Sequence, residues 1–142
     1  MSGGLFTEPS ERMRWLGSTS NGVSLSELKD VPCLILLGDV GMGKSTTVRT
    51  EAALLKVMLA GQKHVVLYED LKRLSEAQIE RRVFENREVE AWVRGEHALT
   101  LILDSLDECW RRIDALEILL VDEFRRRIRK ETGPLFLRLT CR

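Results

Sequence analysis

Short apolar runs alternate along this chain with longer segments in which apolar residues recur at helical spacing. The run Cys33–Leu37 is apolar throughout and precedes Gly38, as expected of a strand buried on both faces of a sheet. Comparable runs predict three more strands, over residues 64–68, 99–103 and 135–140. Because strand and helix alternate throughout, the pattern predicts an α/β fold with a parallel sheet and right-handed crossovers.

Three amphipathic helices are expected between these strands. The first begins at about Lys44 and ends near Gly61, a residue type suited to a C-terminal cap. The second opens with a capping box formed by Ser75 and Gln78 and stops at Gly95. The third is closed by the Gly-Pro pair before the last strand. The inward positions of the three are, in chain order, Val48, Ala52, Leu55 and Leu59, then Ile79, Val83 and Trp92, then Ile113, Leu116, Leu120, Phe124 and Ile128.

The composition indicates one compact domain without a bias in charge. The chain has 142 residues, is 44% apolar, and carries 22 basic and 22 acidic side chains. Its apolar runs are too short to span a membrane, and its three cysteines form neither a metal-binding nor a redox pair, so a cytoplasmic protein without a membrane partner is expected. Residues 1–22 lack a sustained period and predict a loosely ordered lead-in to a domain over residues 23–142.

The segment from Gly38 to Ser45 matches the pattern Gly, four residues, Gly, Lys, Ser between a predicted strand and a predicted helix. Its backbone amides and the helix N-terminus can converge on the phosphates of a nucleoside triphosphate. Lys44 would contact the β- and γ-phosphates, Ser45 would bind Mg²⁺, and Thr46 would support the α-phosphate. The alternative is a glycine-rich turn with an exposed lysine. The predicted nucleotide-binding residues are Gly38, Asp39, Val40, Gly41, Met42, Gly43, Lys44, Ser45 and Thr46.

Acidic residues follow the third predicted strand, at the end where open α/β sheets bind ligands. Asp104 leaves the strand facing the phosphate loop and is the expected carboxylate ligand of Mg²⁺. Hydrolysis also needs a group that orients or deprotonates water, for which Asp107 is favoured and Glu108 is the alternate. Both could instead occupy an exposed helix start, where the helix dipole stabilises acids.

These segments together resemble the NACHT branch of the STAND NTPases, which are signal-transduction ATPases of innate immunity and bacterial antiviral defence. The resemblance covers residues 33–142 and rests on the phosphate loop, on Leu-Ile-Leu-Asp-Ser-Leu-Asp-Glu, and on the terminal Leu-Arg-Leu-Thr-Cys-Arg. It implies a P-loop three-layer α/β sandwich with strand order 1-4-3-2, and ATP with Mg²⁺ as cofactors. In this family a polar residue after the fourth strand reads the γ-phosphate, and Arg142 takes that position.

The family pattern extends beyond this sequence into a fifth strand and a nucleotide-contacting lid domain. Without a fifth strand, the first strand is expected to be an unpaired apolar edge that favours self-association or pairing with a longer relative. Two functions therefore stay open: the slowly hydrolysing nucleotide switch of a signalling or defence ATPase, and a non-catalytic binding or interaction module.

Other functions have weaker support in the sequence. The basic residues between positions 125 and 130 lie on the polar face and last turn of the third predicted helix, where the dipole favours cations, so a solvated surface is favoured over a nucleic-acid site. A GTPase is not indicated, because the chain lacks an Asn-Lys-x-Asp motif. His64 and His97 have no partners at metal-ligand spacing and are read as structural.

Overall fold

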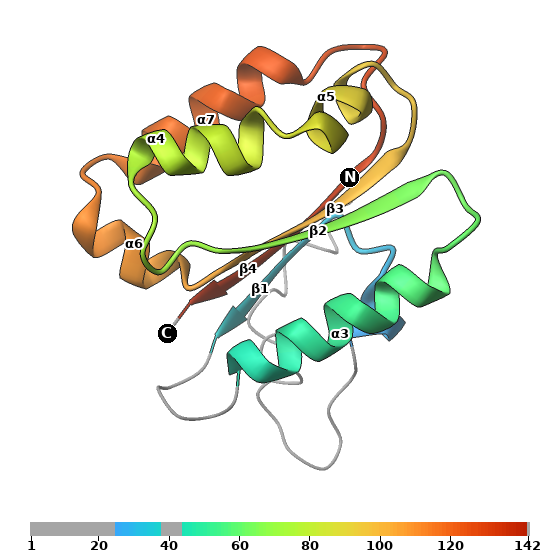
Figure 1. The fold of residues 1–142 in the computed structure, drawn as a ribbon, viewed down its shortest axis with the longest axis horizontal. Coiled ribbons are helices and arrows are strands. Elements are labelled where there is room, and N and C mark those ends of the chain that lie inside the picture. The colour runs from blue at the N-terminus through green and yellow to red at the C-terminus, as the bar shows by residue number, and fades with distance from the viewer. Residues whose placement is uncertain (1–24, 38–43, 142) are drawn as a thin grey trace.

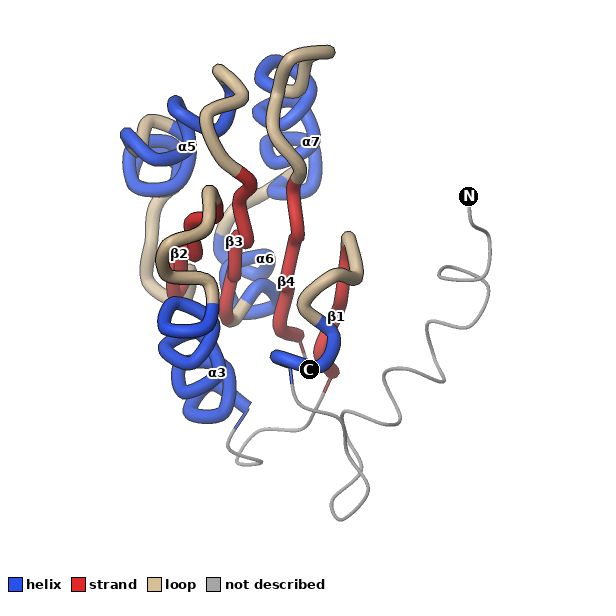
Figure 2. Tube along the Cα trace, turned by 90° about the vertical axis from the view of Figure 1, so that its right-hand side faces the viewer, coloured by secondary structure: helices blue, strands red, loops and turns tan. Residues whose placement is uncertain are grey.

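A computed structural model describes residues 25–37 and 44–141 of the chain. Four parallel strands form one sheet in the order β1-β4-β3-β2, as Figure 2 shows. The strands are β1 (Cys33–Leu37), β2 (His64–Asp70), β3 (Ala98–Asp104) and β4 (Leu135–Cys141). The four predicted strands, the parallel sheet and the predicted strand order are thereby confirmed.

Helices cover the two faces of this sheet unequally (Figure 1). One face packs against α3 (Lys44–Met58), and a short 3₁₀ helix, η1 (Leu25–Leu28), lies against the start of the sheet on the same side. The opposite face carries the remaining elements: α4 (Glu76–Ile79), the π-helix η2 (Glu80–Phe84), α5 (Arg87–Val93), α6 (Leu106–Arg112) and α7 (Leu116–Arg127). None of the helices within residues 25–37 and 44–141 is long and apolar enough to cross a membrane.

The second predicted helix is not continuous. Its capping box is present, since the Ser75 hydroxyl accepts from the Gln78 amide and the Gln78 side chain accepts from the Ser75 amide. The helix then widens into η2 and is interrupted before Asn86, whose side chain accepts from the Glu88 amide at 2.8 Å and starts α5. A second N-cap therefore divides the predicted helix, because Asn satisfies backbone donors better at a helix start than inside a helix. The predicted inward positions Ile79, Val83 and Trp92 are buried, as expected.

The third predicted helix is also shorter than expected. Leu106 to Arg112 form a separate helix, α6, and Ile113 follows it in an extended conformation. Ala115 adopts a left-handed conformation, with φ 58°, and precedes α7. Ile128, predicted to lie inside the helix, is extended and half exposed beyond its end. Apolar spacing could not reveal this break, because Ile113 and Leu116 are buried on either side of it and preserve the helical period.

Trp92 ties α5 to the loop that leads into β4. Its indole N–H donates to the carbonyls of Gly133 and Pro134, at 2.8 and 3.1 Å, and its own carbonyl accepts from the Gly133 amide at 3.0 Å. The ring is buried among the apolar side chains on that face of the sheet. Trp92 therefore sets the position at which the chain enters β4.

Arg138 is a buried charged residue in the middle of β4. Its guanidinium donates to the carbonyls of Leu28, Lys29 and Val31, at 2.9, 3.2 and 2.6 Å. Burial lowers the pKa of Arg138 to about 10, because desolvation disfavours the charged form. The side chain thus fastens the segment before β1 to the central part of the sheet.

The edge strand β1 is buried on one face only, which corrects the prediction of two buried faces. Leu34 and Leu36 pack under α3, whereas Ile35 and Leu37 are 38% and 44% exposed. The reason is position: β1 lies at the sheet edge, beyond the reach of the helices on the opposite face. The predicted apolar edge is therefore present among the described strands.

Candidate functional site

Asp104 lies at the carboxyl end of β3 and is completely buried. Its neighbours β2 and β4 supply one hydroxyl for each carboxylate oxygen. Tyr68 of β2 donates to Oδ2 at 2.5 Å, and Thr140 of β4 donates to Oδ1. Because the three strands are parallel neighbours, these residues meet at the carboxyl end of the sheet, although they are far apart in sequence.

The direction of each hydrogen bond follows from the groups that supply it. The Arg49 Nε–H of α3 lies 3.3 Å from the Tyr68 oxygen, and it can only donate. The Ser105 amide likewise donates to the Thr140 oxygen at 2.8 Å. Both hydroxyls therefore accept from a group that can only donate, and they direct their own protons at Asp104. The network suits an ionised, acceptor-only carboxylate, which is the form that binds metal ions.

Ser105 has a left-handed backbone, with φ 65° and ψ 40°. This conformation is uncommon for a residue other than glycine, and such residues concentrate at functional sites. Here it turns the chain from β3 into α6 while the Ser105 amide contacts Thr140. The turn also places Asp107 and Glu108 in the first turn of α6, directly after the buried carboxylate.

Asp104 is unusual in its electrostatic environment. Among the side chains that the structure describes, no lysine or arginine lies within ion-pair distance of it, and its hydrogen-bond donors are neutral hydroxyls. Buried carboxylates are normally paired with a cation or bind a metal. Burial, followed by the hydrogen bond to Asp104, raises the pKa of Tyr68 to about 12, so this phenol stays protonated and donating at neutral pH.

The described residues provide one buried carboxylate at this end of the sheet. Within residues 25–37 and 44–141, no group of three or more His, Cys, Asp or Glu side chains could hold a metal ion. Mg²⁺ is usually bound by one or two carboxylates with phosphate oxygens and water completing its shell. One buried carboxylate among hydroxyl groups matches that ligand preference.

The predicted phosphate loop falls mostly outside the described part of the chain. Gly38, Asp39, Val40, Gly41, Met42 and Gly43 are not described, nor is Arg142. Lys44, Ser45 and Thr46 form the first turn of α3, although only their backbone is described. Because Arg49 of the next turn reaches Tyr68, the beginning of α3 lies at the same end of the sheet as Asp104.

The predicted water-activating residues lie close to this site in sequence and in the fold. Asp107 and Glu108 are both partly buried in α6. The Glu108 carboxylate is 3.8 Å from the ammonium of Lys72, which follows β2. Glu108 thus also serves a surface ion pair, and its role in chemistry stays a prediction.

Sequence reasoning missed three members of the site: Arg49, Tyr68 and Thr140. The sequence pattern predicts only a strand at Tyr68 and only the end of another strand at Thr140. The available signal was their position, since each is a polar side chain near the carboxyl end of a strand beside β3. Arg49 had no such signal, because it belongs to the exposed surface of a helix.

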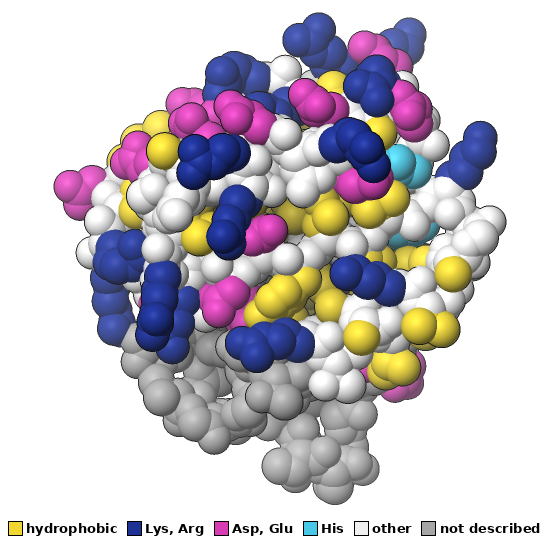
Figure 3. All heavy atoms as spheres, in the orientation of Figure 1, with side chains coloured by type: hydrophobic (Ala, Val, Ile, Leu, Met, Phe, Trp, Pro, Cys, Tyr) yellow, Lys and Arg dark blue, Asp and Glu magenta, His cyan; other side chains and the backbone are white. Residues whose placement is uncertain are grey.

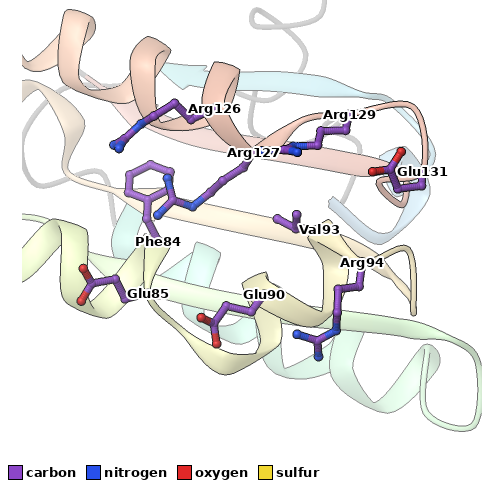
Figure 4. A pocket seen from close by; sticks show the side chains of 9 residues that line it. All are labelled: Phe84, Glu85, Glu90, Val93, Arg94, Arg126, Arg127, Arg129 and Glu131. Atoms are coloured by element: carbon purple, nitrogen blue, oxygen red, sulfur yellow. The ribbon is translucent and has the colours of Figure 1, made fainter.

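A hollow of about 670 Å³ lies elsewhere, between α5 and α7. Figure 4 shows Arg126 and Arg127 extending from one side toward Phe84, with Glu85 and Glu90 on the other. Arg126 and Arg127 both bind the buried carboxylate of Glu123. On this face, basic and acidic side chains are interspersed (Figure 3). A single buried carboxylate thus pairs with two of the arginines near the end of α7.

Comparison with protein-family models, with curated proteins and with solved structures finds no match to this chain.

Proposed function

We propose that the chain binds ATP with Mg²⁺ at the carboxyl end of the sheet and hydrolyses it slowly, as the nucleotide switch of a STAND-type signalling or defence ATPase. The observation that carries this proposal is the buried, doubly hydrogen-bonded carboxylate of Asp104 beside the start of α3. The helix start belongs to the Gly-x-x-x-x-Gly-Lys-Ser motif, and the four-stranded order 1-4-3-2 is compatible with a P-loop sandwich.

Each residue has a defined role in this proposal. The amides of residues 38–43 and the Lys44 ammonium bind the phosphates, and Thr46 supports the α-phosphate. Ser45 and Asp104 hold Mg²⁺, which when bound neutralises phosphate charge. Asp107 orients or deprotonates the attacking water, with Glu108 as alternate. Arg142 reads the γ-phosphate, as the family resemblance implies.

Replacing Lys44 with alanine should weaken binding of a fluorescent ATP analogue by about 10- to 100-fold, because hydrogen bonds to charged groups contribute about 1.5–3 kcal/mol. The measurement is a fluorescence-anisotropy titration with Mg²⁺ present. Lys56→Ala is the matched control, since this lysine occupies the last turn of the same helix. Equal affinity of Lys44→Ala and wild type would exclude the motif as a phosphate site.

The second candidate is a non-catalytic interaction module. The exposed Ile35 and Leu37 on the edge strand favour it, since an unpaired apolar edge is a template for pairing with another chain. A steady-state phosphate-release assay separates the two candidates. Nucleotide binding without phosphate release would favour the module. Phosphate release that is lost in Asp107→Asn would favour the enzyme.

Placing a charge on this edge should prevent self-association if the module interpretation is correct. Ile35→Lys is expected to sediment as a monomer at concentrations where wild type forms dimers or larger species, because lysine on an edge strand opposes strand pairing. Leu54→Lys is the control, since Leu54 is also an exposed apolar residue but lies on α3. A monomeric wild type, or association retained by Ile35→Lys, would contradict self-association through this edge.

A further inference from the structure

We propose that Tyr68 is a positioning residue that orients the Asp104 carboxylate for Mg²⁺ and, with Arg49, couples that carboxylate to α3. The inference rests on the proposed function and deepens it. Tyr68 and Arg49 lie outside the three sequence segments on which the family resemblance rests.

The first support is the geometry of the carboxylate. Oδ2 accepts from Tyr68 and Oδ1 accepts from Thr140, so the carboxylate cannot rotate without losing a hydrogen bond. A carboxylate offers about four lone-pair positions, and the two hydroxyls from the described strands use two of them. Counting the described residues alone, each oxygen keeps a lone pair for a metal or for metal-bound water, while the plane of the group is fixed.

The second support is the charge of the partners. Tyr68 and Thr140 are neutral donors, so they fix Asp104 without neutralising it. A lysine or arginine in the place of Tyr68 would form an ion pair and compete with the divalent cation. A phenol satisfies the buried oxygen and leaves the negative charge available for a cation.

The third support is the connection to α3. Arg49 Nε–H donates to the Tyr68 oxygen at 3.3 Å, and Tyr68 donates to Asp104 at 2.5 Å. The chain of hydrogen bonds thus runs from α3 through β2 to β3. Lys44 and Ser45 begin α3. The chain of hydrogen bonds therefore connects the helix that is proposed to bind phosphate with the carboxylate that is proposed to bind the metal.

The test uses Tyr68→Phe, which retains the ring and removes only the hydroxyl. We expect the gain in nucleotide affinity that Mg²⁺ provides to fall about tenfold, because loss of a group that orients a metal ligand typically weakens metal binding by about 10- to 100-fold. Affinity measured in EDTA should stay within twofold of wild type. The probe is the same fluorescent ATP analogue.

Thr100→Val is the matched control. It removes a different buried hydroxyl, which lies near the start of β3 and contacts His64 at 2.7 Å. Its Mg²⁺ dependence should equal that of wild type. Tyr68 is the chain's single tyrosine, so one ¹³Cζ signal reports on it directly. This signal should shift when Mg²⁺ and nucleotide are added together and should remain in place with nucleotide in EDTA.

The outcomes separate the two levels of the proposal. Mg²⁺-dependent binding by wild type that Tyr68→Phe leaves unchanged would overturn the positioning role alone. Equal weakening of binding with and without Mg²⁺ would also overturn it, because a merely structural hydroxyl has that effect. A wild-type chain that binds no nucleotide under either condition would overturn the proposed function and this inference with it.

Discussion

Replacing Trp92 with alanine should lower the free energy of unfolding by about 3–5 kcal/mol, the typical effect of truncating a buried aromatic residue. The indole is 1% exposed, and its N–H donates to the carbonyls of Gly133 and Pro134. The substitution thus leaves a cavity and also removes the donor for two backbone acceptors. Urea unfolding followed by circular dichroism measures the change.

Trp92→Phe separates packing from hydrogen bonding. Phenylalanine fills much of the cavity and supplies no donor, so we expect a smaller loss of about 1–3 kcal/mol, the magnitude for an unsatisfied buried group. An alanine variant within 1 kcal/mol of wild type would contradict the packing described for α5 and the loop before β4. Equal losses in the two variants would instead assign the whole effect to the hydrogen bonds.

Gly95→Ala should lower the free energy of unfolding by about 3 kcal/mol or more. Gly95 has φ +80°, a conformation that disfavours an L-residue by roughly 1–2 kcal/mol. An added Cβ would also lie 2.3 Å from the backbone carbonyl oxygen of Glu131, which cannot move away as a side chain would. Forcing an extra carbon into such a contact adds about 1–3 kcal/mol.

Gly61→Ala isolates the contribution of the clash. Gly61 has nearly the same φ, +83°, but a Cβ there would meet nothing within 4 Å. The expected loss is therefore only the conformational part, about 1–2 kcal/mol. The same urea unfolding experiment compares the two variants. If both lose the same stability, the close approach of residues 95 and 131 does not contribute.

The strands were predictable because short, mostly apolar runs separate the helical segments along the chain. The helices were less predictable where local capping competes with periodicity. Asn86 starts a new helix within an apparently continuous pattern, and Ala115 turns the chain without disturbing the spacing of buried residues. Such breaks depend on single residues, and the helical spacing of apolar residues over many positions does not reveal them.

The candidate site was predictable in part for a similar reason. Asp104 follows a strand in an evident motif, so the sequence pointed to it directly. Its partners Tyr68 and Thr140 come from two other strands, and their meeting depends on sheet order and register. Tyr68 and Thr140 are each 36 residues from Asp104, and nothing in the sequence around them indicates that both bind the same carboxylate.

The arginine inside β4 also sets a lower limit on the size of the folding unit. Three of the carbonyls that accept from Arg138 belong to Leu28, Lys29 and Val31, upstream of the first strand. A fragment starting at Pro32 would leave an interior cation without those acceptors. A truncation from the N-terminus must therefore retain η1, even though the regular sheet starts only at Cys33.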